Sequence, residues 1–128
     1  MKEAIRSAQA PAPIGPYSQA IRADGLLFCS GQIPLDPQGE DLVGEDAGSQ
    51  TAQVLRNLGA ILRAAGLDFS DVVKTTIFLV DMADFTAVNT AYEAAFGTNR
   101  PARSTVACAA LPRGARVEIE AIASFAEL

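Results

Sequence analysis

The chain contains no histidine. This absence excludes Ser-His-Asp and Cys-His nucleophile pairs, histidine-ligated metal sites and any imidazole acid or base. A reaction catalysed by this chain has to use carboxylate, arginine, hydroxyl and backbone groups. We therefore expect no metal ion in its chemistry.

Cysteine is almost as scarce, because only Cys29 and Cys108 are present. Two isolated cysteines without a Cys-x-x-Cys pair make neither a disulfide framework nor a zinc site. Each lies in an apolar run typical of a strand, so we interpret both as buried small hydrophobic residues. No signal peptide is recognisable, and we expect a reduced, cytoplasmic protein.

Basic runs and long apolar runs are also lacking. Ten basic residues, only two of them lysine, stand against fifteen acids and give a net charge of −5. A surface that follows nucleic-acid phosphates is therefore not expected. No apolar run approaches the roughly 20 residues of a membrane span. We expect residues 1–128 to form a single domain that folds without disulfides.

The order of the expected elements predicts an α+β fold. Asp24-Gly25 between two apolar runs predicts a tight hairpin, Gly66 and Gly97 fit the ends of helices, and Asp84 fits an N-cap. We expect strands at 2–6, 17–23, 26–30, 71–80, 104–109 and 116–125, helices at 48–65 and 85–96, and loops at 8–16 and 31–45. This order favours a mixed sheet with both helices on one face.

The strand at 71–80 is apolar on both faces. One parity carries Val73, Thr75, Ile77 and Leu79; the other carries Val72, Lys74, Thr76, Phe78 and Val80. Two helices can cover one face only, so the other face requires a different cover. We expect a second copy of the chain there, and the alternative is that loop 31–45 folds back over it.

Residues 100–125 hold the two groups best suited to chemistry. Arg103 lies at the start of one expected strand and Glu118 inside the next, so we expect a cation and a carboxylate on neighbouring strands. Such a pair suits a small anionic substrate, because a guanidinium binds a carboxylate through two hydrogen bonds. The alternative for Arg103 is a surface arginine or an ion pair.

Glu118 and Glu120 share one strand face, about 6.6 Å apart along the strand. Val117, Ile119, Ala121 and Ala123 would form the core-facing set. By itself this pattern indicates a solvated face. If the face were an interface between subunits, burial would raise a carboxylate pKa and a nearby arginine would lower it, and the group could activate water.

Four further residues give weaker signals for a polar pocket. Tyr17 and Ser30 lie near the ends of the first hairpin, and Gly31 follows with an unobstructed N–H. Glycine after a strand usually only turns the chain. Asn89 lies beside the apolar stripe of the second helix, where an exposed helical asparagine is the alternative.

Four separated motifs together resemble one family over essentially the whole chain. They are IGPYSQA at 14–20, CSGQIPLDPQG at 29–39, RPARSTV at 100–106 and VEIEAIA at 117–123. On these motifs the chain is identified as similar to the RidA/YjgF family of reactive intermediate deaminases.

The resemblance implies a chorismate-mutase-like fold and a homotrimer in which the face of the sheet without helices meets the trimer core. It implies cofactor-free hydrolysis of 2-aminoacrylate, 2-iminopropanoate and 2-iminobutanoate to 2-oxo acids and ammonia. Arg103 would hold the substrate carboxylate and Glu118 would activate water. Tyr17, Ser30, Gly31 and Asn89 would line the pocket, and Thr105 would offer its backbone N–H.

The chain departs from many family members at Thr105, where they carry cysteine. Cys108 lies three residues further on, at the opposite strand parity, so a thiol mechanism is not expected. A backbone N–H does not depend on the side chain, and the deaminase chemistry is therefore retained.

Two other functions compete with deamination. A non-catalytic trimer could bind 2-oxo acids with the same pocket. Ribonuclease activity has been attached to relatives, but the net charge, the missing histidine and the lack of basic or aromatic stacking patches argue against it.

Overall fold

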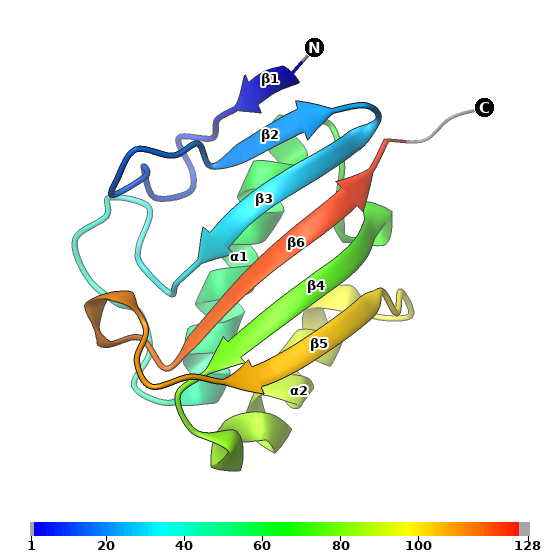
Figure 1. The fold of residues 1–128 in the computed structure, drawn as a ribbon. Coiled ribbons are helices and arrows are strands. Elements are labelled where there is room, and N and C mark those ends of the chain that lie inside the picture. Colours follow the sequence, from blue (N-terminus) through cyan, green and yellow to red (C-terminus); the bar gives the residue numbers. More distant parts are fainter. Residues whose placement is uncertain (1, 126–128) are drawn as a thin grey trace.

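The computed structural model describes residues 2–125, which form a six-stranded mixed sheet with two long helices on one face (Figure 1). The elements are β1 (Lys2–Ile5), β2 (Ala20–Ala23), β3 (Leu26–Gln32), α1 (Ala47–Ala64), β4 (Val72–Leu79), α2 (Phe85–Phe96), β5 (Ala102–Ala107) and β6 (Val117–Ser124). The strand order is β1-β2-β3-β6-β4-β5, and only the β4–β5 pair is parallel. The predicted mixed sheet with two helices on one face is confirmed.

The predicted hairpin joins β2 to β3. Asp24 and Gly25 have φ of 51° and 79°, the positive values that a two-residue type I′ turn requires. The preceding strand is shorter than predicted, because β2 begins at Ala20 and leaves Tyr17 in the loop. Since β1 ends at Ile5, residues 17–19 have no strand beside them on that edge.

Helix α1 begins one residue earlier than predicted. Asp46 and Ser49 form a capping box in which the Asp46 carboxylate accepts a hydrogen bond from Ser49 N at 2.8 Å. Gly66 follows the helix with φ of 80°, as predicted for its C-terminal end. Helical spacing predicts one apolar stripe on this helix, and its members are buried except for Ala65, which follows the helix and is half-buried. The predicted members are Val54, Leu55, Leu58, Ile61, Leu62 and Ala65.

Helix α2 has the predicted bounds, but its cap differs from the prediction. Asp84 stands at the N-cap position and makes no capping hydrogen bond. A short 3₁₀ turn, Met82–Asp84, leads into the helix, so Asp84 has helical φ and ψ of −84° and −1° rather than the extended values of a side-chain cap. Its carboxylate accepts a hydrogen bond from Arg116 at 3.4 Å instead.

The buried side of α2 is an aromatic stack. Val88, Tyr92 and Phe96 are buried, and the rings of Tyr92 and Phe96 stack with centroids 4.3 Å apart. The helical spacing of Phe85, Val88, Tyr92, Ala95 and Phe96 predicts that all five belong to this buried stripe. The prediction is wrong for Phe85, because its side chain is 38% exposed. Phe85 lies on the first turn of α2, where its ring is beside the Arg103 guanidinium instead.

The predicted alternation along β4 fails at its first residues. Val72 pairs with Ala123 and Lys74 with Ile122, so a β-bulge places Val73 outside the register. Val72 is therefore buried at 3% exposure, whereas Val73, predicted to share one face with Thr75, Ile77 and Leu79, is 45% exposed. From Lys74 onward the alternation is as predicted.

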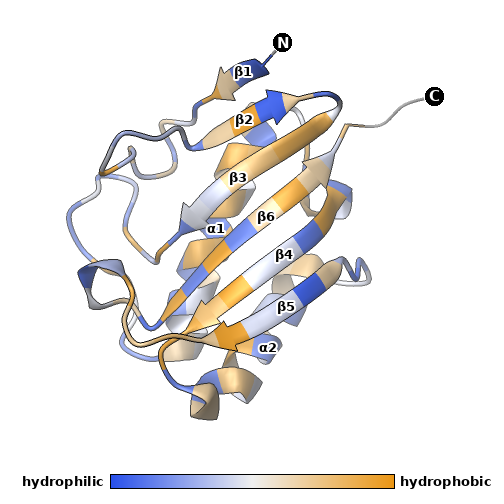
Figure 2. Cartoon of the chain, in the orientation of Figure 1, coloured by the Kyte–Doolittle hydropathy of each residue, from blue (hydrophilic) through white to orange (hydrophobic). Residues whose placement is uncertain are grey.

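The sheet face opposite the helices is open in the described protomer, and it faces the viewer in Figure 2. It carries apolar groups, including Phe28 at 43% and Val106 at 42% exposure. Loop 31–45 does not cover it. Asn57 of α1 donates to the carbonyls of Ile33 and Leu35 at 3.2 and 2.9 Å, which holds this loop on the helix side.

Neither long helix, nor any other helix within residues 2–125, is long and apolar enough to cross a membrane.

Candidate active site

Arg103 and Glu118 are not on neighbouring strands, contrary to the prediction. Arg103 of β5 pairs with Thr75 of β4, whereas Glu118 of β6 pairs with Phe78 on the other edge of β4. The chain between β5 and β6 crosses the end of β4 before β6 begins (Figure 1). One strand therefore separates the two groups.

The two groups also belong to opposite faces of the sheet. Arg103 shares its row with Thr75, whose hydroxyl lies 2.7 Å from the Tyr92 hydroxyl under α2. Glu118 shares its row with Phe78, on the open face. Within one protomer the cation and the carboxylate cannot bind the same small substrate.

Arg103 lies in an aromatic cradle on the helix side. Its guanidinium carbon is 5.1 Å from the Tyr92 ring centroid and 5.6 Å from that of Phe85, both within the range of cation–π contact. The ion pairs among residues 2–125 are Arg100–Glu93 and Arg116–Asp84, so the predicted alternative of an ion pair for Arg103 is wrong. The half-buried guanidinium takes part in neither of these ion pairs.

A shallow cavity of about 420 Å³ opens beside this guanidinium. Half-buried Asn89 lines it together with Tyr92, Arg100 and Arg103. The structure thus brings together two predicted site residues, Arg103 and Asn89. Their side chains can hydrogen-bond a carboxylate and a second polar group of one small ligand.

Thr105 lies two residues along β5 on the same face as Arg103, in a row with Ile77. Its hydroxyl oxygen is the one buried side-chain polar atom within residues 2–125 that has no hydrogen-bond partner. The Thr105 hydroxyl thus lies where no polar group of the described residues can hydrogen-bond it.

Glu118 is half-buried on the open face and next to Gly31. Burial raises the pKa of its carboxyl, and the negative charge of Glu120 raises it further. A Cβ on Gly31 would overlap Oε2 of Glu118. Gly31 lies in the segment from Cys29 to Gln32, where the pairing of β3 with β6 shifts in register. Glu120 itself is exposed.

The remaining predicted residues gather near Glu118 rather than Arg103. Tyr17 and Gly31 line one small cleft, and the Tyr17 hydroxyl accepts a hydrogen bond from Ile14 N at 3.2 Å. The Ser30 hydroxyl is already hydrogen-bonded within the chain, because it donates to Ser18 O at 2.6 Å. The predicted site is therefore split into two groups: a cation half with Arg103, Asn89 and Thr105, and a carboxylate half with Glu118, Gly31, Ser30 and Tyr17.

The two cysteines differ in burial. Cys29 is buried, as predicted, and burial raises the pKa of its thiol to about 12. The same prediction is wrong for Cys108, which is half-buried because it follows the end of β5, and its Sγ donates to Leu79 O at 3.4 Å. Within residues 2–125, no group of three His, Cys, Asp or Glu residues could hold a metal.

Sequence reasoning missed the role of Phe85 and Tyr92. Their helical spacing predicted that both side chains belong to the core. Spacing alone does not distinguish an aromatic ring packed in the core from an aromatic ring that contacts an arginine. The available signal was Thr75, a polar residue inside an apolar strand that gives the Tyr92 hydroxyl a partner.

Known proteins resemble the chain along nearly its whole length. A family model described as Endoribonuclease L-PSP matches residues 7–125. The chain is 51% identical over 123 residues to the 2-iminobutanoate/2-iminopropanoate deaminase of Mus musculus, which covers 96% of this chain and 91% of that protein. It is 52% identical over 124 residues to the chloroplastic Reactive Intermediate Deaminase A of Arabidopsis thaliana, covering 97% of this chain and 66% of that protein. The crystal structure of RidA from the Antarctic bacterium Psychrobacter superposes with a TM-score of 0.92 at 39% identity, covering 96% of this chain and 99% of that one.

Proposed function

Because the chain belongs to the family described as Endoribonuclease L-PSP, which includes the RidA/YjgF deaminases, we propose that it is a 2-iminobutanoate/2-iminopropanoate deaminase. It hydrolyses these imines, and the enamine 2-aminoacrylate after tautomerisation, to 2-oxo acids and ammonia. The activity uses no cofactor and, in our prediction, operates in the cytoplasm.

The observation that carries this proposal is the unpaired Arg103 guanidinium above two aromatic rings. A 2-imino acid has one carboxylate next to the reacting carbon. A bidentate pair with Arg103 would fix this carboxylate and, with it, the plane of the C=N bond. Asn89 lines the same cavity and would contact the remaining polar atoms of the substrate.

Glu118 would act as the general base. Water attacks C2 of the protonated imine, Glu118 accepts one proton of that water, and the C=N electron pair moves to nitrogen, which gives a neutral carbinolamine. Glu118 then returns its proton to the amine nitrogen, the C–N bond breaks and ammonia leaves, while the hydroxyl loses its proton to solvent as the C–O bond becomes the carbonyl. The raised pKa of Glu118 makes it a stronger base, and such assistance contributes about 10²- to 10⁴-fold.

The opposite orientations of Arg103 and Glu118 support a site shared between two copies of the chain. The open face carries exposed Phe28 and Val106, which a second copy would bury. A ring of three copies would place the cation half of each protomer against the carboxylate half of the next. We therefore propose a homotrimer with three composite sites.

The test is ammonia release when a threonine dehydratase generates 2-iminobutanoate in the assay. We expect the parent to accelerate release, and Arg103→Ala and Glu118→Ala each to lose about 10²-fold or more. Arg113→Ala, an exposed arginine outside both halves, is the matched control. Parent-like rates for Arg103→Ala would contradict the carboxylate clamp.

A purely binding function predicts a different result in the same experiment. The protein would then bind 2-oxobutanoate saturably without any gain over the rate in buffer. A rate gain that disappears in Glu118→Ala would rule out binding as the sole role.

A further inference from the structure

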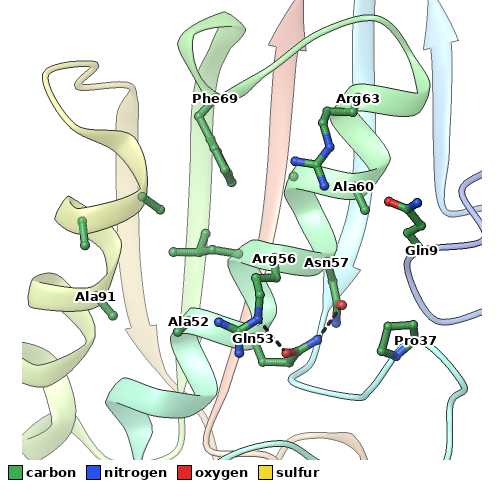
Figure 3. Close-up of a pocket in the computed structure, with 14 residues that line it drawn as sticks. Gln9, Pro37, Ala52, Gln53, Arg56, Asn57, Ala60, Arg63, Phe69 and Ala91 are labelled. Atoms are coloured by element: carbon green, nitrogen blue, oxygen red, sulfur yellow. Dashed lines mark hydrogen bonds between the residues drawn. The ribbon is translucent and has the colours of Figure 1, made fainter.

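A hollow larger than the cavity beside Arg103 lies elsewhere on the molecule. It is an outer groove of about 550 Å³ over the solvent side of α1, flanked by α2 on one side and by Gln9 and Pro37 on the other (Figure 3). It opens away from the open sheet face and lies on the side of α2 that carries Ala91, Ala94 and Ala95, whereas the Arg103 cavity of the proposed trimer contact uses Asn89, Tyr92 and Glu93 of that helix. The outer groove and the proposed trimer contact therefore involve different residues.

The floor of the outer groove is made of small residues from both helices. Figure 3 shows Ala52, Ala60 and Ala91 along it, and the full set is Ala52, Gly59, Ala60, Ala91, Ala94 and Ala95. Gly59 is buried and has an ordinary helical backbone. A Cβ there would lie 3.2 Å from Arg63 Nη1 and 3.2 Å from the Phe69 ring, so its missing side chain makes room for these two residues of the same chain. Two helices with such small side chains let a third backbone approach to about 8 Å.

Two cations border the outer groove and no acid lines it. Arg56 and Arg63 take part in neither ion pair of the described residues, although the chain carries a net charge of −5. Arg56 Nε donates to Gln53 Oε1 at 2.9 Å, which orients the guanidinium and leaves its other donors free. The two arginines are seven residues apart, about 10.5 Å along the helix.

A small anion does not fit this arrangement. Small-ligand pockets need polar groups that converge on one point, whereas these two cations are two helical turns apart. The amides of Gln53 and Asn57 are already engaged with each other and with the carbonyl of Leu35. No unpaired buried polar group of residues 2–125 lines the outer groove.

A second copy of the chain does not fit either. An occupant that pairs with both arginines needs two carboxylates on one helical face. The helices α1 and α2 contain a single acid between them, Glu93, which pairs with Arg100 at 3.1 Å.

We propose that the outer groove docks an acidic amphipathic helix of another protein, with two carboxylates two turns apart that bind Arg56 and Arg63. Its small apolar residues would pack on the alanine floor and add a third helix to the α1–α2 layer.

The probe is a fluorescein-labelled alanine-based 18-residue helical peptide with Glu at positions i and i+7, compared with the same peptide carrying Gln there. At low salt we expect the Glu peptide to bind the intact protein about tenfold more tightly.

Arg56→Gln and Arg63→Gln should each weaken binding of the Glu peptide about two- to fivefold, because exposed ion pairs of this kind contribute that much to affinity. Lys2→Gln, which removes an equal charge outside the outer groove, should leave binding unchanged. Amide NMR shifts should map to Ala60 and Ala91.

Three results would overturn the proposal. In the first, the Glu and Gln peptides bind equally, or neither binds at millimolar concentration. In the second, glutarate or inorganic phosphate shifts the same amides as strongly, so that the occupant is a small anion. In the third, the shifts follow protein concentration without peptide, so that the occupant is a second copy.

Discussion

Gly31 leaves the space that the Glu118 carboxylate fills, since a Cβ on Gly31 would overlap Oε2 and lie 2.9 Å from Cδ. Gly31→Ala must therefore displace the carboxylate. We expect kcat/KM for imine hydrolysis to fall about 10²-fold, as a misplaced catalytic group does. Stability should change by less than about 1 kcal/mol, because the end of a half-buried side chain can rotate away.

Gly48→Ala is the control for this substitution. Its added Cβ would meet only ordinary contacts at 3.7 Å or more in the first turn of α1. Kinetics like the parent are expected for Gly48→Ala, and similar losses in both variants would mean that Gly31 has no specific link to Glu118.

Two substitutions at Tyr92 separate its ring from its hydroxyl. Tyr92→Phe keeps the ring under Arg103 but leaves the buried Thr75 hydroxyl without its 2.7 Å partner. We expect unfolding to become easier by about 1–3 kcal/mol, measured by urea titration, with KM nearly unchanged. Tyr92→Leu removes the cation–π contact as well and should raise KM about two- to fivefold. Equal KM values in the two variants would show that the ring does not position Arg103.

The pH dependence of activity should depend on Glu120. Burial and the Glu120 charge raise the Glu118 pKa, so kcat/KM should decline as pH falls through that raised value and the base becomes protonated. Glu120→Gln removes the like charge and should move this acidic limb to lower pH. An acidic limb at the same pH in both proteins would contradict the effect of the Glu120 charge on the base.

The same shift makes a prediction about stability. A carboxyl with a raised pKa in the folded state binds more protons than it does in the unfolded state, so stability decreases as pH rises from the unfolded to the folded pKa. Glu118→Gln should flatten the pH dependence of the urea midpoint in this window. A slope as steep as that of the parent would mean that other groups produce it.

The unpaired hydroxyl of Thr105 predicts a stabilising substitution. Thr105→Val keeps the shape and removes a buried oxygen without a partner, so we expect about 1 kcal/mol more stability by thermal or urea unfolding. Thr51→Val is the opposite case, because the buried Thr51 hydroxyl donates to Ala47 O at 2.7 Å. A loss of stability in both variants would show that Thr105 has a partner in the assembled protein.

A mixing experiment tests whether two copies share each site. Arg103→Ala and Glu118→Ala, each nearly inactive alone, should recover about a quarter of parental activity when unfolded and refolded together in equal amounts, the fraction of intact sites in random trimers. Arg103→Ala mixed with the double variant should recover nothing. If the two single variants also recover nothing, the composite site is wrong.

The sequence predicted the bounds of individual helices and strands better than it predicted which strands pair. Gly97 and an uninterrupted apolar stripe defined α2, and its bounds were correct. The pairing of β5 was wrong because proximity along the chain suggested β6. A helix between two strands is the usual connection of a parallel pair, and α2 lies between β4 and β5, so this signal was present and unused.

The features that the sequence did not predict depend on how the strands fit together, and no short sequence motif marks them. The bulge at Val73 involves no glycine or proline, and its exposure results from how β4 fits β6. The seven candidate residues were assigned to one pocket because a sequence does not state which sheet face meets which subunit. Only the pairing register showed Arg103 and Glu118 to be on opposite faces.

This two-faced arrangement has a consequence for any preparation of the protein. In the proposed trimer, an isolated protomer holds every required side chain and is nonetheless inert. Specific activity would then decrease on dilution below the dissociation constant of the trimer, while spectroscopic signals of folding stay constant. Turnover per milligram would thus serve as an assay of assembly as well as of catalysis.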